Sequence, residues 1–166
     1  MRRVSMARLL FASILLLSIV LQGLLFPDLL TIRILPNLAL VLILCWSAVM
    51  GAGEGAIWAL GTGLLFDALS LDPMGANGLA FLAVALLGAS AGRRFFQASI
   101  FPPIPVAFVA TWCYALILLI IRAGESGGAP LSALAPLILL QALLNSLLVV
   151  IVYPITRILS RSIARV

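Results

Sequence analysis

The chain has 166 residues, of which 64% are hydrophobic and only 9% are charged. A soluble domain carries nearer a quarter of charged residues, so we expect this chain to lie in a lipid bilayer. Histidine is absent, which excludes histidine-based acid–base catalysis and argues against zinc or haem. We therefore predict no metal and no cofactor, and we expect Cys45 and Cys113 to be buried free thiols.

Apolar runs between charged residues, glycines and prolines predict an all-α, polytopic membrane bundle that forms a single domain over residues 1–166. A helix needs about 20 apolar residues to cross the hydrocarbon layer. The first run follows three arginines, but it is too long for a signal peptide and lacks a cleavage motif, so we expect an uncleaved anchor. The six expected spans are Leu9–Phe26, Ile34–Met50, Gly55–Leu71, Gly75–Ala91, Ile100–Ile121 and Leu131–Tyr153.

The positions of the arginines predict the orientation of these spans. Cytoplasmic loops of membrane proteins carry an excess of basic residues. A cytoplasmic N-terminus leaves only Arg33 and Arg122 outside, and six spans then return the C-terminus to the cytoplasm. The net charge of +5 is explained by this topology, so we expect no nucleic-acid partner. We interpret Arg122–Pro130 as a flexible, glycine-rich surface loop. The arginines expected inside are Arg2, Arg3, Arg8, Arg93, Arg94, Arg157, Arg161 and Arg165.

Glycines spaced four residues apart predict close helix packing. Gly51 with Gly55, and Gly88 with Gly92, have the small-xxx-small spacing that lets two helix backbones approach in lipid. Such rows either pack the internal bundle or receive the helix of another protein.

The third span carries an ionisable side chain, Asp67, among apolar residues. A charge at the centre of a membrane helix costs about 2.5–3.5 kcal/mol on insertion scales, so such a side chain normally faces protein or a wet cavity. Pro73, Gly75 and Asn77 then form a turn into the fourth span. Two interpretations remain: an outward-facing polar pocket or partner-docking notch, or a brace in which Asp67 and Asn77 cap the turn, with Arg33 as a countercharge.

The last span carries two amides, Gln141 and Asn145, four residues apart on one helix face. Amides in lipid seek each other or a neighbouring helix, so we interpret this pair as an interhelical clamp.

The sequence contains no set of residues that is typical of catalysis. Only five acidic residues are present, too few and too scattered for a metal-dependent phosphotransferase. We therefore predict no catalytic residue and no enzyme activity. A channel would need a polar stripe along a whole span, and none is evident.

The chain contains, in this order, Pro36–Asn37, Trp46, Gly63, Asp67, Ser70 and Gly75. This ordered set resembles the MreD family of bacterial rod shape-determining membrane proteins. The glycine pair of the fourth span followed by two arginines, Gly88 and Gly92 before Arg93–Arg94, also resembles that family. Ala89 departs from it, since an aromatic residue is common there, and residues 100–166 match mostly by hydropathy.

This resemblance implies a non-catalytic scaffold subunit of the cell-elongation machinery in the bacterial inner membrane. It would bind the single transmembrane helix of MreC and connect MreB filaments with RodA and a penicillin-binding transpeptidase. The implied fold is similar to the S subunits of energy-coupling-factor transporters. The resemblance also implies a binding or structural corner near the outer side of the membrane. The residues that would build this corner are Pro36, Asn37, Gly63, Asp67, Ser70, Pro73, Gly75 and Asn77.

The same corner residues are also compatible with a second function. In this alternative the protein is a vitamin-type S subunit of a transporter, with Asn37, Asp67 and Asn77 as ligand contacts. The sparse polar inventory argues against it, since a ligand pocket usually offers more hydrogen-bonding side chains.

Overall fold

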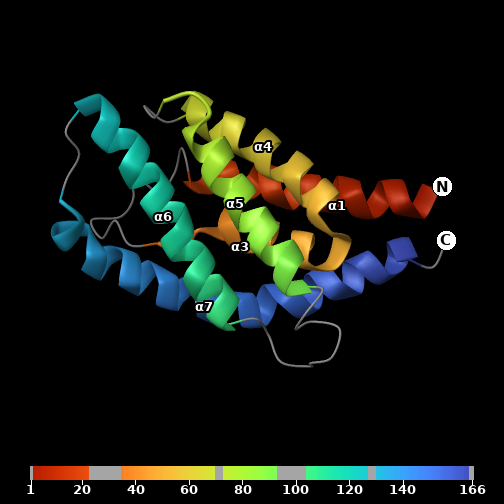
Figure 1. The fold of residues 1–166 in the computed structure, drawn as a ribbon. Coiled ribbons are helices and arrows are strands. Elements are labelled where there is room, and N and C mark those ends of the chain that lie inside the picture. Colours follow the sequence, from red (N-terminus) through yellow and green to blue (C-terminus); the bar gives the residue numbers. More distant parts are fainter. Residues whose placement is uncertain (1, 23–34, 70–72, 93–103, 127–129, 165–166) are drawn as a thin grey trace.

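The computed structural model describes residues 2–22, 35–69, 73–92, 104–126 and 130–164, and these residues form helices without any strand. Successive helices run in alternating directions, so the N- and C-termini lie at the same end of the bundle (Figure 1). The six helices are α1 (Arg2–Val20), α3 (Leu38–Met50), α4 (Ala52–Leu69), α5 (Ala76–Ala91), α6 (Ile104–Ser126) and α7 (Leu131–Ala164).

Several helices begin where a turn residue makes a helix start favourable. Asn37 is the N-cap of α3, and its side-chain oxygen accepts a hydrogen bond from the Leu40 amide at 3.0 Å. Gly75 precedes α5 with a φ of 95°, a backbone conformation that glycine adopts without strain. Helix α3 therefore begins at Leu38 and α5 at Ala76, after the first residues of the apolar runs that start at Ile34 and Gly75.

The last two helices extend beyond the runs that the sequence predicts. Helix α6 continues to Ser126, so the expected loop Arg122–Pro130 is helical in its first part. Helix α7 continues through Pro154, although this proline closes the apolar run. Prolines are tolerated inside membrane helices more readily than inside helices in water. Close to Pro154, the Thr156 hydroxyl donates to the Tyr153 carbonyl at 2.8 Å.

Within the described residues, two helices are long and apolar enough to cross a membrane, α6 over Ile104–Gly124 and α7 over Leu131–Ser160. The apolar helices α3 and α5 are shorter. With 13 residues α3 is only about 20 Å long, less than the roughly 30 Å hydrocarbon layer. That all six helices cross the membrane remains a prediction.

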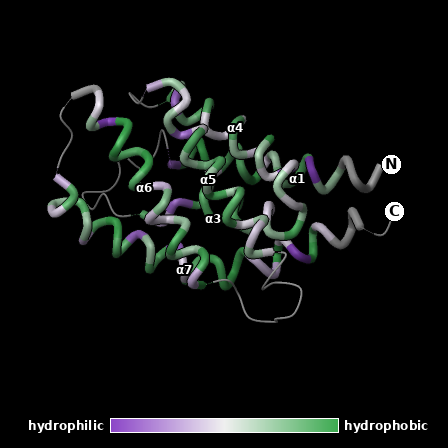
Figure 2. Tube along the Cα trace, in the orientation of Figure 1, coloured by the Kyte–Doolittle hydropathy of each residue, from purple (hydrophilic) through white to green (hydrophobic). Residues whose placement is uncertain are grey.

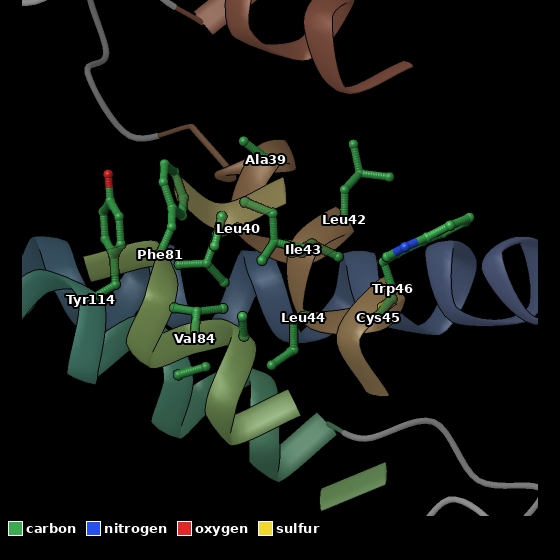
Figure 3. Close-up of a cluster of buried hydrophobic side chains, with 14 of the residues drawn as sticks. Ala39, Leu40, Leu42, Ile43, Leu44, Cys45, Trp46, Phe81, Val84 and Tyr114 are labelled. Atoms are coloured by element: carbon green, nitrogen blue, oxygen red, sulfur yellow. The ribbon is translucent and has the colours of Figure 1, made fainter. Parts of the chain in front are cut away.

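Helix α3 lies at the centre of the bundle. Its residues Ala39–Ser47 are all buried, and side chains from α5 and α6 such as Phe81, Val84 and Tyr114 gather beside it (Figure 3). Large apolar side chains on α1, α4 and α7 point outward instead, and Figure 2 shows hydrophobic stretches on most helices. An apolar exterior of this extent is typical of a surface that faces lipid or another protein.

Helix α1 packs against the bundle along one side, with Phe11, Leu15 and Ile19 in the hydrophobic core. The ring of Phe11 stacks on Trp46 of α3 at 4.0 Å and meets Trp58 of α4 edge-on at 5.3 Å. Arg8 forms an ion pair with Glu54 of α4, and the Trp46 indole N–H donates to the same carboxylate at 3.2 Å. One acidic side chain thus connects α1, α3 and α4.

Candidate functional site

The carboxylate of Asp67 organises the turn between α4 and α5. Asp67 lies in the last turn of α4 and is only 3% exposed. One oxygen accepts the Gly75 amide at 2.7 Å, and the other accepts the Asn77 amide at 3.0 Å and the Asn77 side-chain N–H at 2.9 Å. Because the first amides of a helix have no partner within that helix, a carboxylate at this position satisfies them and complements the helix dipole.

Asn77 also forms a hydrogen bond with a third helix, α6. Its side-chain oxygen accepts a hydrogen bond from the Tyr114 hydroxyl of α6 at 2.5 Å. The Tyr114 ring packs against Phe81 at 4.9 Å, and Phe81 in turn contacts Phe66 at 5.7 Å. Asp67, Asn77 and Tyr114, which we call the polar corner, therefore connect α4, α5 and α6 in a buried position.

A second buried cluster centres on Asn145 of α7. Its oxygen accepts the Asn37 amide at 2.7 Å, and its N–H donates to Thr111 of α6 at 3.0 Å. Gln141, one turn earlier, donates to the Leu35 carbonyl at 3.2 Å. Both amides of α7 thus bond to groups outside α7, although not to each other. We call Asn37, Thr111 and Asn145 the amide cluster.

Helix α6 carries one residue of each cluster. Thr111 and Tyr114 are three residues apart, so they lie on the same face of the helix, and both are buried. The sequence analysis missed both of them, and it also missed Glu54. The spacing of the two hydroxyl groups within an apolar run was the available signal.

The glycine at position 63 brings α4 and α5 together beside the polar corner. A Cβ atom there would overlap the backbone of Asn77 and Gly78. Gly63 lies one turn before Asp67, so this close approach places the carboxylate within reach of the start of α5. Pro73 completes the turn, because its carbonyl accepts the Ala76 amide at 3.0 Å. Pro36 is half-buried before α3.

Three glycines of the small-residue rows face the interior of the bundle. Cβ atoms at Gly55, Gly88 and Gly92 would overlap residues of α3. Gly88 would meet Leu44 and Ser47, and Gly92 would meet Ala48. Gly51 differs, because it ends α3 with a φ of 93° and has no atom within 4 Å of its Cβ position. The predicted Gly51–Gly55 row is therefore a turn residue followed by a packing residue.

Some predicted positions lie outside the described residues. They are Ser70, Arg33, Arg93, Arg94 and Arg165.

The arrangement of polar groups is structural. In the part of the chain that the structure describes, no group of three or more metal-binding side chains comes together. Both oxygens of Asp67 and both polar atoms of the Asn77 side chain are engaged in hydrogen bonds. These groups can hold helices together, and ligand binding would require breaking bonds that already exist.

A comparison with protein-family models matches residues 2–159 to the family described as rod shape-determining protein MreD. The chain belongs to the MreD family. Its membership covers nearly the whole sequence, so the role of this chain is rod-shape determination, in a family of membrane proteins. Neither the search of curated proteins nor the search of solved structures returned a match. The similarity of this family member to transporter S subunits therefore stays a prediction.

Proposed function

We propose that this MreD family member is a non-catalytic scaffold of the cell-elongation machinery. It lies in the bacterial inner membrane, with six membrane-crossing helices and both termini in the cytoplasm. It binds the transmembrane helix of MreC and holds MreB filaments near RodA and a penicillin-binding transpeptidase. The observation that carries this proposal is the family match over residues 2–159.

The internal bonding of the bundle supports a scaffold. The polar corner joins α4, α5 and α6, and the amide cluster joins α3, α6 and α7. Five of the six described helices are thereby connected by buried polar bonds. A scaffold that presents a fixed outer surface to partners gains from such rigidity, because interhelical hydrogen bonds and close glycine contacts fix helix positions in lipid.

The placement of the glycines narrows the surface that a partner helix can use. Gly55, Gly88 and Gly92 are in contact with α3, which leaves no room for a partner at those positions. MreC therefore binds the lipid-facing exterior of the bundle, whose shape near the α4–α5 turn depends on the polar corner.

Co-purification with MreC tests this proposal. The full chain and MreC are expressed together, extracted in mild detergent and purified through a tag on one partner. We expect MreC to be retained by the wild type and by Gly61→Ala, a change at an exposed helical glycine with no atom within 4 Å. Asp67→Leu should retain less than half as much. Failure of the wild type to retain MreC would overturn the proposal.

The transporter alternative makes a different prediction. The side chains proposed as vitamin contacts, Asn37, Asp67 and Asn77, are all used in bonds within the protein. A vitamin found by mass spectrometry in the purified wild type would favour that alternative over the scaffold.

A further inference from the structure

Helices α4 and α5 form a hairpin that is shorter than a typical membrane is thick. Helix α4 has 18 residues and α5 has 16, so at 1.5 Å per residue they are about 27 Å and 24 Å long. The hydrocarbon layer of a typical bilayer is about 30 Å thick. A tilt of the hairpin would shorten its reach across the membrane, so these lengths are upper limits.

Contacts between described residues fix both ends of this hairpin. At the turn between the helices, the Asp67 carboxylate in the last turn of α4 accepts the amides of Gly75 and Asn77 at the start of α5. At the opposite end, Gly92 directly after α5 lies so close to Ala48 of α3 that a Cβ atom would overlap the Ala48 backbone. The hairpin therefore cannot cover a thicker layer by sliding one helix along the other.

The exposed apolar side chains of the hairpin, which we call the apolar belt, cover a still shorter stretch. On α4 they run from Ile57 to Leu69, which is twelve residues or about 18 Å along the helix. One turn beyond the belt, Gly53 on α4 and Ser90 on α5 are exposed and add no apolar side chain. The apolar belt consists of Ile57, Leu60, Leu64, Leu65, Leu69, Met74 in the turn, Leu79 and Leu86.

Helix α7 has a much longer apolar surface. Its exposed apolar side chains run from Leu131 to Ile158, which is about 40 Å along the helix. Among the described residues α7 does not contact α4, and the two helices lie on different sides of the bundle (Figure 1). A helix that is longer than the hydrocarbon layer can tilt, whereas a shorter helix cannot lengthen, so the lipid beside α4 and α5 has to adapt to the protein.

We propose, given the membrane embedding described under the proposed function, that the apolar belt binds phospholipids with short acyl chains and thins the bilayer beside the hairpin. Short chains cover the belt without placing Ser90 or the partly exposed ion pair of Arg8 and Glu54 in hydrocarbon. Longer chains would have to compress or to cover these groups. A second copy of the chain on this face would bring an equally short hairpin, so the mismatch would persist around the pair.

Competition between lipids around the full chain in vesicles tests this proposal. Dimyristoleoyl-, dioleoyl- and dierucoylphosphatidylcholine, which share one headgroup and differ in chain length, each compete with a brominated dioleoyl lipid that quenches tryptophan fluorescence. Trp58 is half-buried on α4 and reports on the lipid beside the hairpin. We expect the wild type to bind the dimyristoleoyl lipid at least about threefold more strongly than the dierucoyl lipid.

Variants that lengthen the belt should shift this preference. Gly53→Leu/Ser90→Leu extends the belt by one turn, about 6 Å, and both positions are exposed. We expect the preference for short chains to fall to less than about half of the wild-type ratio. Gly61→Leu is the matched control, because it adds a leucine within the belt at a position with no atom within 4 Å and does not lengthen it. This variant should keep the wild-type ratio.

Several outcomes would overturn the proposal. Equal binding of short and long lipids by the wild type is one, and an unchanged ratio in the double variant is another. An equal loss of preference in Gly61→Leu would show that the length of the belt is not the cause. Crosslinking of the wild type into dimers through this face in all three lipids would identify a second copy as its occupant.

Failure of the lipid proposal can be told apart from failure of the proposed function. If the wild type shows no chain-length preference but still retains MreC, the scaffold function stands and only the lipid proposal is wrong. Recovery of the wild type outside the membrane fraction would instead contradict the proposed function.

Discussion

The carboxylate of Asp67 binds Asn77 twice, through the backbone amide at 3.0 Å and through the side-chain N–H at 2.9 Å. Asn77 is ten residues later in the sequence and belongs to the next helix. These two hydrogen bonds explain how an acidic residue is accommodated in an apolar segment. The carboxylate oxygens accept hydrogen bonds from groups at the start of α5 that have no partner within that helix. The Tyr114 hydroxyl of α6 donates to Asn77 and so joins the same network.

Replacing Asp67 by leucine should destabilise the protein strongly. The change leaves three donors on Gly75 and Asn77 without their acceptor, and each unsatisfied buried group costs about 1–3 kcal/mol. Thermal unfolding of the detergent-purified protein measures the effect. Asp67→Asn keeps one acceptor oxygen and should lose less stability than the leucine variant. Equal stability of wild type and Asp67→Leu would show that the network contributes nothing.

Glycine-to-alanine substitutions should separate packed glycines from exposed ones. A methyl group at Gly88 would overlap Leu44 and Ser47, so Gly88→Ala should cost about 1–3 kcal/mol. At Gly61 nothing lies within 4 Å, and alanine is the better helix former, so Gly61→Ala should be neutral or stabilising by up to about 1 kcal/mol. The two variants are compared by their unfolding temperatures. A larger loss at position 61 than at position 88 would contradict the described packing of α5 against α3.

The side-chain amides of Gln141 and Asn145 in α7 should contribute differently to the stability of the protein. Asn145 is fully buried and bonds to both α3 and α6, whereas Gln141 is half-buried and makes one longer bond. Interhelical hydrogen bonds in membranes average about 0.6 kcal/mol and reach about 1.7. Asn145→Leu should therefore be more destabilising than Gln141→Leu by about 1 kcal/mol or more. A double-mutant cycle of Asn145→Leu with Thr111→Val should show coupling, and strict additivity would argue against their hydrogen bond.

The ion pair between Arg8 and Glu54 should contribute weakly and depend on salt. The Arg8 side chain is 49% exposed and the Glu54 side chain 21% exposed, so solvent screens their attraction. Pairs of this kind typically couple by about 0.2–1 kcal/mol. Arg8→Gln and Glu54→Gln, alone and combined, should give a coupling that falls as ionic strength rises. A coupling unaffected by salt would indicate that the pair is shielded from solvent.

Much of the helical architecture is predictable from the sequence. Each apolar run overlaps one described helix, although α1, α6 and α7 differ from their runs in where they begin or end. Asp67, Gly75 and Asn77 come together in the turn, as the interpretation of a brace required. These features are local, because the turn residues and the acid lie within ten residues of one another. The four-residue spacing of Gln141 and Asn145 likewise indicated a shared helix face.

Contacts between distant segments were beyond sequence reasoning. Nothing in the sequence indicates that Tyr114 bonds to Asn77 or that Asn145 bonds to Asn37, because these pairs depend on how α5, α6 and α7 cross. Gly51 was assigned to a packing row from its spacing alone, and only its backbone conformation identifies it as a turn residue. The continuation of α7 past Pro154 was missed because a proline ends helices in water more strictly than in lipid.

Cell shape tests most directly whether the polar corner supports the family's role in rod-shape determination. The measurement is the length-to-width ratio of bacteria depleted of their own MreD protein and supplied with this chain or a variant at equal membrane levels. We expect the wild type and Gly61→Ala to restore rods, and Asp67→Leu to leave rounded cells. Full restoration of rod shape by Asp67→Leu would contradict the claim that the function depends on this corner.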